Sequence, residues 1–425
     1  MAPGAASAAG TLGEQCSGEN ITGKGSSLQK LAQQNVWDPG FNTSANAKGC
    51  NGTQGSKGIP TVTYTSVGSG AGMEAWGLNG HAFEGSNGYV GTDEPPNQQQ
   101  KEEIESHKTV EKANHESLET IPVLQGSVAV IVNLPTNCKG TSNAFIGRLV
   151  LDNVTLEGIW NGTITKWNQI TENGDKINGT GCTTAEKEST ITRVVRLDES
   201  GTTSIFKKYL ALINGEPVFG ELGWRQISEG LANNEDWPGT VTRPSATGGG
   251  ALVKKVAETP GSISYANLAD ARANTSFIPP LGGNNKAAFW TPIQNNGVEQ
   301  EEETYADPST NLNKAETANA NCENTEYTNG ETPFPPASTL APWNEVTTKT
   351  TQVHYTLCGL TYDLEFHEYR KYPGTTLGQA TTVSNFIRWT LGTGGGQKVI
   401  VKHDYLALPS SIDLEAQEGA EKIKF

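Results

Sequence analysis

Long apolar runs are missing from this sequence of 425 residues. No stretch approaches the roughly 18 consecutive apolar residues that a membrane-spanning helix requires. Only 35% of the residues are hydrophobic, whereas glycine (49 residues) and proline (21 residues) are abundant. The composition therefore excludes a multi-span membrane protein and indicates a soluble, loop-rich chain that is long enough for two or three domains.

An excess of positive charge is missing as well. The chain has 31 lysines and arginines against 46 aspartates and glutamates, which gives a formal net charge of −15. Nucleic acids and anionic membranes are bound through basic patches, so neither is expected as a partner. The net charge does not exclude a small anion, because such a ligand is held by local hydrogen-bond donors.

Signatures of catalysis are missing too. The six histidines lie in no recognisable arrangement with a Gly-x-Ser-x-Gly nucleophile motif, which is itself absent, and the sequence has no His-Glu-x-x-His motif. We therefore predict that the chain is not an enzyme and needs no metal or cofactor. A hydrolase with a nucleophilic serine is the alternative, and release of phosphate from a chromogenic ester would support it.

No Cys-x-x-Cys pair occurs among the six cysteines. Wide spacing is typical of disulfides in an exported protein and not of zinc ribbons or redox dithiols. Pairing between sequence neighbours is our hypothesis, namely Cys16–Cys50, Cys138–Cys182 and Cys322–Cys358. The segment Ala6-Ser7-Ala8 resembles the end of a signal-peptide cleavage site. We therefore expect an extracytoplasmic protein whose signal peptide has been removed.

The most informative stretch that is present covers residues 191–210. Its β-branched start, residues 191–195, predicts a short buried strand, and the later spacing of apolar residues predicts a helix. The free N–H groups and the positive dipole at such a helix start attract an anion. Arg196 could add a planar guanidinium that Asp198 holds in position. An ordinary capped helix beside a surface Arg–Asp pair is the alternative.

The segment Arg-Leu-Asp-Glu-Ser-Gly-Thr-Thr in this stretch resembles the Arg-x-Asp-Gly-Ser-Gly-Thr segment of the phosphate-specific periplasmic binding proteins. These are the substrate-binding subunits of the bacterial phosphate ABC importer. The resemblance implies that Asp198 aligns Arg196 and that four residues bind the anion, namely Arg196, Ser200, Gly201 and Thr202. Glu199 stands where the family has glycine, so its side chain should face solvent or be paired.

Three earlier segments also resemble this family. The Gly-Lys-Gly-Ser-Ser-Leu segment is similar to the family's opening turn, which implies that the Ser27 hydroxyl and the Leu28 amide bind the ligand. Residues 62–72 alternate as a strand and end in a glycine-rich turn, and the resemblance maps a further ligand hydroxyl to Ser69, with a helix starting near Met73. Asp93 maps to the ligand carboxylate. An ionised carboxylate only accepts hydrogen bonds, so Asp93 should accept one from hydrogen phosphate and repel sulfate.

The resemblance also implies the fold: an α/β protein of the two-lobed periplasmic-binding-protein type, with open, mostly parallel sheets and a cleft between the lobes. Residues 121–135 resemble the first strand that crosses between lobes, and residues 353–362 resemble the return strand. Trp160 and Trp167 are then core residues. The predicted domains are residues 1–122 and 353–425 for lobe 1 and residues 123–352 for lobe 2, with a loop-rich insertion around 285–350.

The function implied by the resemblance is extracytoplasmic binding of inorganic phosphate between two lobes that close by a hinge. The partners would be the permease and ATPase subunits of a phosphate ABC importer. The alternative is that the same fold serves as a cell-surface structural or self-assembling component, since fold and role are separable. The long insertion and the additional cysteines are the features that favour this alternative.

Overall fold

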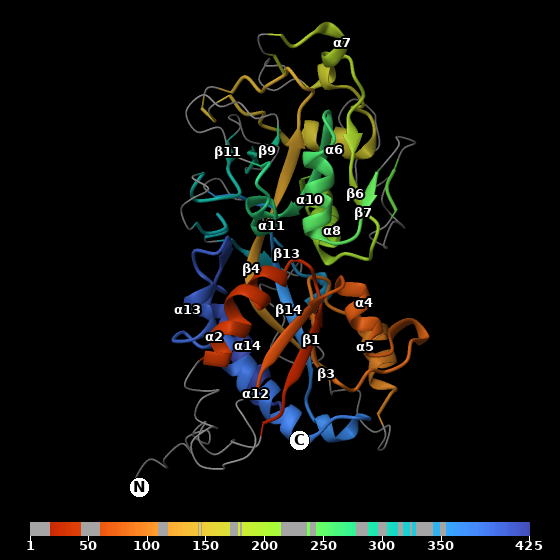
Figure 1. Ribbon diagram of the computed structural model, residues 1–425, viewed down its shortest axis with the longest axis vertical. Helices are drawn as coiled ribbons and strands as arrows, with labels where there is room; N and C mark the ends of the chain where they lie inside the picture. Colours follow the sequence, from red (N-terminus) through yellow and green to blue (C-terminus); the bar gives the residue numbers. More distant parts are fainter. Residues whose placement is uncertain are drawn as a thin grey trace.

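The chain forms two α/β lobes that are stacked along the long axis of the molecule (Figure 1). The computed structural model describes residues 18–43, 60–108, 118–142, 144–145, 147–170, 177–178, 181–213, 236–238, 244–277, 288–295, 304–312, 318–323, 325–328, 343–348 and 354–425.

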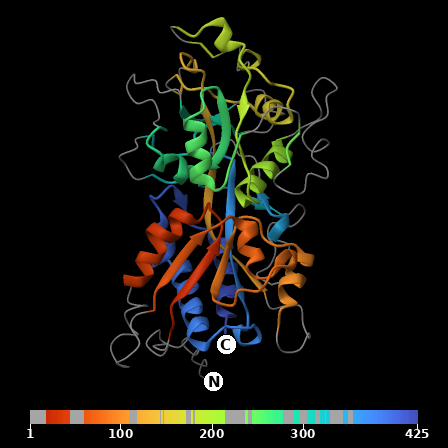
Figure 2. The ribbon, with the colours of Figure 1, turned by 45° about the vertical axis from the view of Figure 1, so that its right-hand side comes forward.

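Lobe 1 is built on three parallel strands with β1 (Ile21–Gly25) between β2 (Val62–Ser66) and β3 (Asn87–Thr92). Figure 2 shows these strands side by side in red and orange. The C-terminal part of the chain returns to this lobe and packs α12 (Leu377–Leu391) against β1 and β3. The other helices of the lobe are α1 (Lys30–Ala32), a π-helical turn (Gln33–Trp37), α2 (Asp38–Thr43), α4 (Ser69–Glu74), α5 (Gln98–Glu105), α13 (Gly396–Ile400) and α14 (Ser410–Glu421).

Two long strands, β4 (Leu118–Asn133) and β14 (Cys358–Phe366), connect the lobes. In lobe 1, β4 pairs with β14 over residues 118–127. In lobe 2 it pairs with β8 (Ser262–Asn267) over residues 128–133 and with β9 (Ala288–Thr291) over residues 130–133. One nine-stranded sheet therefore runs through both lobes in the order β2-β1-β3-β14-β4-β8-β5, with β9 and β15 (Tyr405–Leu406) also paired to β4. The predicted two-lobed α/β fold with crossing strands is confirmed. Within this sheet, β1 pairs in parallel with β2 and β3, and β5 pairs in parallel with β8, whereas each pair that involves a crossing strand is antiparallel.

In lobe 2 the sheet is covered on both faces. Val128 and Val130 of β4 belong to one apolar cluster, whereas Ala129 and Ile131 belong to another, because successive side chains of a strand point to opposite faces. The first cluster includes residues of α6 (Asn153–Asn161) and α8 (Gly201–Ile213), and the second includes residues of α10 (Gly249–Ala257) and α11 (Leu268–Ala273). The predicted core tryptophans, Trp160 and Trp167, are fully buried.

The prediction of one continuous strand at residues 191–195 is wrong. The structure divides it into β5 (Thr192–Arg193), which pairs with β8, and β6 (Val195–Arg196), which pairs with β7 (Ser245–Ala246). The chain therefore leaves the main sheet at Val194. The helix expected near Met73 also starts earlier, at Ser69, because Gly68 makes the turn after β2 with a φ of 99° that favours glycine. The predicted lobe limits at residues 122–123 and 352–353 stay predictions.

Two of the three expected disulfides are confirmed, Cys138–Cys182 and Cys322–Cys358. Cys16 and Cys50 lie outside the described residues. The second disulfide fastens the loop-rich insertion to β14, and the described parts of the insertion contain short strands. These are β10 (Ile293–Gln294), β11 (Tyr305–Ala306), β12 (Tyr327–Thr328) and β13 (Thr347–Thr348).

The remaining elements are short: α7 (Thr184–Lys187) and the 3-10 turns Leu78–Gly80, Trp167–Gln169, Trp343–Glu345 and Tyr369–Lys371. Over the ranges that the structure describes, we find no helix with both the length and the apolar character needed to cross a membrane.

Candidate anion-binding site

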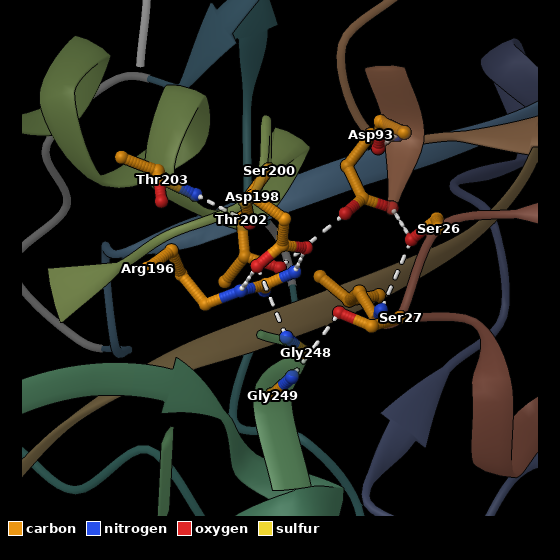
Figure 3. Close-up of polar contacts among 12 residues, drawn as sticks. Ser26, Ser27, Asp93, Arg196, Asp198, Ser200, Thr202, Thr203, Gly248 and Gly249 are labelled. Carbon is orange, nitrogen blue, oxygen red and sulfur yellow. Dashed lines mark hydrogen bonds and ion pairs between the residues drawn. The ribbon is translucent and has the colours of Figure 1, made fainter. Parts of the chain in front are cut away.

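The sequence-predicted site residues meet at the boundary between the lobes, where strand ends and helix starts converge (Figure 3). Lobe 1 brings the turns that follow β1, β2 and β3, and lobe 2 brings the turn between β6 and α8. All of these residues are described, and all but the half-buried Asp198 are buried: Ser27, Leu28, Ser69, Asp93, Arg196, Ser200, Gly201 and Thr202.

Asp93, at the end of β3, is the polar centre of the site. Its Oδ1 accepts hydrogen bonds from Ser26 Oγ at 2.5 Å and from Thr361 Oγ1 at 2.7 Å. Its Oδ2 accepts a hydrogen bond from Thr202 Oγ1, across the lobe boundary, at 3.3 Å. Burial raises the pKa of Asp93 to about 6, although these hydroxyls and Arg196 favour the ionised form. The carboxylate is therefore ionised above that pH and joins the two lobes.

Arg196, at the end of β6, is held by Asp198. Arg196 Nε donates to Asp198 Oδ1 at 2.7 Å, and its NH2 group donates to Asp198 Oδ2. The Gly248 amide donates to the same carboxylate at 3.0 Å. Burial opposes ionisation of Asp198, but Arg196 and the Gly248 amide hold its pKa below the ordinary value. Figure 3 shows the guanidinium extending toward the space between Asp93 and Ser27.

Helix α8 starts at this site because Ser200 caps it. Ser200 Oγ accepts a hydrogen bond from the Thr203 amide at 3.3 Å, the usual contact of an N-cap side chain. The hydroxyl groups of Thr203 and Tyr265 lie 2.6 Å apart, and Phe206 stacks on Tyr265 with ring centroids 4.7 Å apart. Packing on the buried sheet therefore fixes where the N-terminus of α8 points.

Gly201, the first residue of α8, allows the lobes to approach closely. A Cβ atom at this position would lie 2.6 Å from Asp93 Cβ and 2.7 Å from Ser69 Oγ. Distances this short essentially never occur for real Cβ atoms, so no other residue fits at position 201 without movement of a lobe.

A second helix of lobe 2 also starts at the boundary. The Gly249 amide, in the first turn of α10, donates to Ser27 Oγ at 3.3 Å. A cavity of about 510 Å³ adjoins this contact, and its lining includes Ser27, Lys30, Ser66 and Thr247. The site therefore opens onto a polar cavity with a lysine in its wall.

Sequence reasoning missed four residues that contact the predicted ones: Ser26, Thr361, Gly248 and Gly249. Ser26 is adjacent to a predicted residue, and three successive glycines before a helix were a usable signal. Thr361 carried no local signal, since it lies in the return strand β14. The Leu28 amide, expected to contact the ligand, donates here to Ser26 Oγ at 3.0 Å.

Glu199, the departure from the family pattern, turns toward lobe 1. A Cβ atom on Gly70 would lie 2.1 Å from Glu199 Oε2, so this carboxylate lies against the first turn of α4. The Gly70 amide donates to the Glu199 carbonyl at 3.3 Å.

Taken together, a guanidinium, several hydroxyls and the N-termini of α8 and α10 converge around one carboxylate. Such donors can surround an oxyanion, because unpaired amides and the helix dipole both favour negative charge. The carboxylate can accept a hydrogen bond only from a ligand atom that carries a proton.

Known proteins resemble this chain in sequence. The phosphate-binding protein PstS 3 of Mycobacterium tuberculosis (strain ATCC 25618 / H37Rv) is 28% identical over 228 residues, which cover 52% of this chain and 51% of that protein. The protein of the same name from Mycobacterium leprae (strain TN) is 30% identical over 224 residues, or 51% of this chain and 50% of that protein. The chain thus spans about half the length of the relatives that it matches.

Solved structures resemble it in fold. A phosphate-binding protein from Stenotrophomonas maltophilia has a TM-score of 0.58 at 17% identity, covering 94% of this chain and 93% of that one. PfluDING, a high-affinity periplasmic phosphate-binding protein solved with phosphate, has a TM-score of 0.60 at 18% identity, with coverage of 94% and 93%. Residues 8–335 match the sequence profile described as "PBP superfamily domain". The chain therefore belongs to the PBP superfamily, that of the periplasmic binding proteins.

Proposed function

We propose that this chain binds inorganic phosphate outside the cytoplasm and delivers it to the permease and ATPase subunits of an ABC importer. The observation that carries the proposal is Asp93, a buried carboxylate that accepts hydrogen bonds from hydroxyl groups of both lobes, next to the anchored guanidinium of Arg196. A carboxylate at an anion site favours a ligand that brings its own proton. Hydrogen phosphate does so, whereas sulfate has none near neutral pH.

The remaining ligand contacts are assigned by chemistry. Arg196 offers a planar fork of donors that suits a phosphate group. Ser27, Ser69, Ser200 and Thr202 offer hydroxyls, and Leu28 and Gly201 offer amides. The Leu28 amide becomes available once the ligand displaces its present partner, Ser26 Oγ. Asp198 keeps Arg196 in place through its paired hydrogen bonds.

Closure of the lobes is the second part of the proposal. Thr202 contacts Asp93 and Gly249 contacts Ser27 across the boundary, so contacts between the lobes involve the same residues that would hold the ligand. A phosphate bound to both sets favours the closed arrangement, as in other hinge-closing proteins. We expect the chain to bend where β4 and β14 pass between the lobes.

The extracytoplasmic location and the role in import rest on further support. Two disulfides are typical of a protein that works in an oxidising compartment. Relatives of the chain are named phosphate-binding proteins. The ligand contacts are binding contacts, and we propose no catalytic step.

Isothermal titration calorimetry with phosphate and with sulfate tests the proposal. We expect the wild type to bind phosphate and not sulfate. Arg196→Ala removes charge-assisted hydrogen bonds that are each worth about 1.5–3 kcal/mol, so affinity should fall at least about 100-fold. Asp93→Asn should gain affinity for sulfate, because an amide can donate to that anion. Arg370→Ala, at an exposed arginine paired with Glu368, is the control and should change neither affinity. A wild type that binds no phosphate refutes the proposal.

A further inference from the structure

A second buried carboxylate, Asp270 of α11, lies beside the candidate site. Only 6% of its surface is exposed, and its Oδ2 has no hydrogen-bond partner among the described residues. A buried polar atom without a partner is costly and points to a missing ligand, water or ion. Asp270 was not among the residues predicted from the sequence.

Geometry places this oxygen at the contact between α10 and Ser27. A Cβ atom on Gly249 would lie 2.2 Å from Asp270 Oδ2 and 3.7 Å from Ser27 Oγ. The two oxygens therefore flank the same point in the first turn of α10, and glycine at position 249 is what leaves room for the carboxylate. Because the Gly249 amide donates to Ser27 Oγ, Asp270 borders the site from the side of lobe 2.

Lys30 of α1 and Arg196 of β6 are the positive groups that act on Asp270 among the described residues, and Tyr405 of β15 is another titratable group near it. Strand β8 contributes no charged side chain, and the lysines of α10 lie in its last turn. Arg272, on the same helix as Asp270, is bound to Asp404 at 2.7 Å. Burial raises the pKa of Asp270 to about 6, against the attraction of Lys30 and Arg196.

An ionised Asp270 would repel a phosphate dianion bound beside it, because Asp270 is buried and solvent screens its charge only weakly. Adding one proton reduces the repulsion and supplies a hydrogen bond. The proton can reside on Asp270, which then donates to hydrogen phosphate, or on the ligand, which then donates to Asp270 as dihydrogen phosphate. Both arrangements contain the same atoms, and the proton comes from solvent in each.

Building on the proposed function, we propose that Asp270 is a specificity-determining residue that shares a proton with the bound ligand. Phosphate binding then takes up one proton from solution when both Asp270 and the ligand are ionised beforehand. The ligand class is then restricted to oxyanions with one proton that makes a hydrogen bond to Asp93 and a second proton that can be shared with Asp270.

Calorimetry at about pH 8, where inorganic phosphate is mostly dibasic, measures this uptake directly when it is repeated in buffers of different ionisation enthalpy. We expect the wild type to take up about one proton per phosphate and to lose affinity about tenfold per pH unit above that pH. Asp270→Asn should take up almost none and should show an affinity that barely changes with pH. Asp270→Ser serves the same comparison if the asparagine variant does not fold.

Asp413→Asn is the matched control. Asp413 also has a pKa raised by burial and an oxygen without a hydrogen-bond partner, but it lies on α14 in lobe 1. This variant should keep the uptake of the wild type. Phosphate binding without proton uptake, or uptake that persists in both Asp270 variants, overturns the inference and leaves the proposed function intact. Failure of the wild type to bind phosphate at all instead refutes the proposed function.

Discussion

A methyl group at position 201 should act as a wedge between the lobes. In Gly201→Ala the new Cβ would lie 2.6 Å from Asp93 Cβ and 2.8 Å from the Asp93 carbonyl carbon. A backbone atom cannot move aside as the end of a flexible side chain can, so the lobes must separate. Overpacking of this kind costs about 1–3 kcal/mol, which corresponds to a loss of phosphate affinity of about 5- to 150-fold.

The loss should appear in binding and not in stability. Without ligand the lobes can part and relieve the contact, and alanine is the better helix former by up to about 1 kcal/mol. The melting temperature of the ligand-free variant should therefore equal or exceed that of the wild type, while calorimetry shows the weaker binding. The stabilisation that phosphate gives to the folded protein should shrink in proportion to the affinity.

Gly250→Ala is the matched control. This glycine also lies in the first turn of a lobe 2 helix, α10, but the atom nearest to a new Cβ among the described residues would be Asp270 Oδ1 at 3.7 Å, an ordinary contact distance. The control should bind phosphate as the wild type does. If Gly201→Ala also retains full affinity, the close approach of α8 to Asp93 does not occur in the phosphate-bound protein, and the reasoning is wrong.

Three further predictions concern stability. Burial and the nearby Asp363 raise the pKa of Asp38 to about 8, so the folded chain holds a proton that the unfolded chain releases near pH 4. The free energy of unfolding should therefore fall as the pH rises from about 4 to about 8. In urea titrations, the free energy of unfolding of Asp38→Asn should depend less on pH over this range. Replacing Cys322 and Cys358 by alanine opens a loop with a sequence separation of 36 residues and should cost about 4 kcal/mol in denaturant unfolding under oxidising conditions. Tyr265→Phe removes the 2.6 Å contact with Thr203 and should lower the free energy of unfolding by about 0.5–1.5 kcal/mol.

The elements that could be predicted are those whose local pattern agrees with their tertiary role. Strand β4 was recognisable because it is buried on both faces, and α8 because its apolar residues recur at helical spacing. The division between β5 and β6 could not be predicted, since it depends on which partner each short strand finds. Those partners, β8 and β7, lie far along the chain, and nothing in the local sequence at Val194 indicates the change.

The candidate site shows the same division. Arg196, Ser200 and Gly201 sit in one short motif whose turn and helix start can be read locally. Thr361 and Gly249 reach the site only because β14 and α10 are placed there by the sheet. The sequence around Thr361 indicates a strand and nothing more, and the three glycines at residues 248–250 indicate a helix start but not where it lies in the fold. Asp270 is the extreme case: its significance comes from an oxygen without a partner, which is a property of the folded chain.

The charges around the site explain how an acidic chain can select an anion. Two cations, Lys30 and Arg196, face three carboxylates, those of Asp93, Asp198 and Asp270, and the whole chain carries a formal charge of −15. Net attraction therefore cannot supply the affinity, because an oxyanion without a proton meets more carboxylates that repel it than cations that attract it. Fixed amides and hydroxyls can donate hydrogen bonds to any oxyanion, whereas the carboxylates can accept a hydrogen bond only from an oxyanion that carries a proton. Selectivity would then depend on the small number of cations around the site. Adding a lysine near the site should widen the range of bound anions and not simply strengthen phosphate binding.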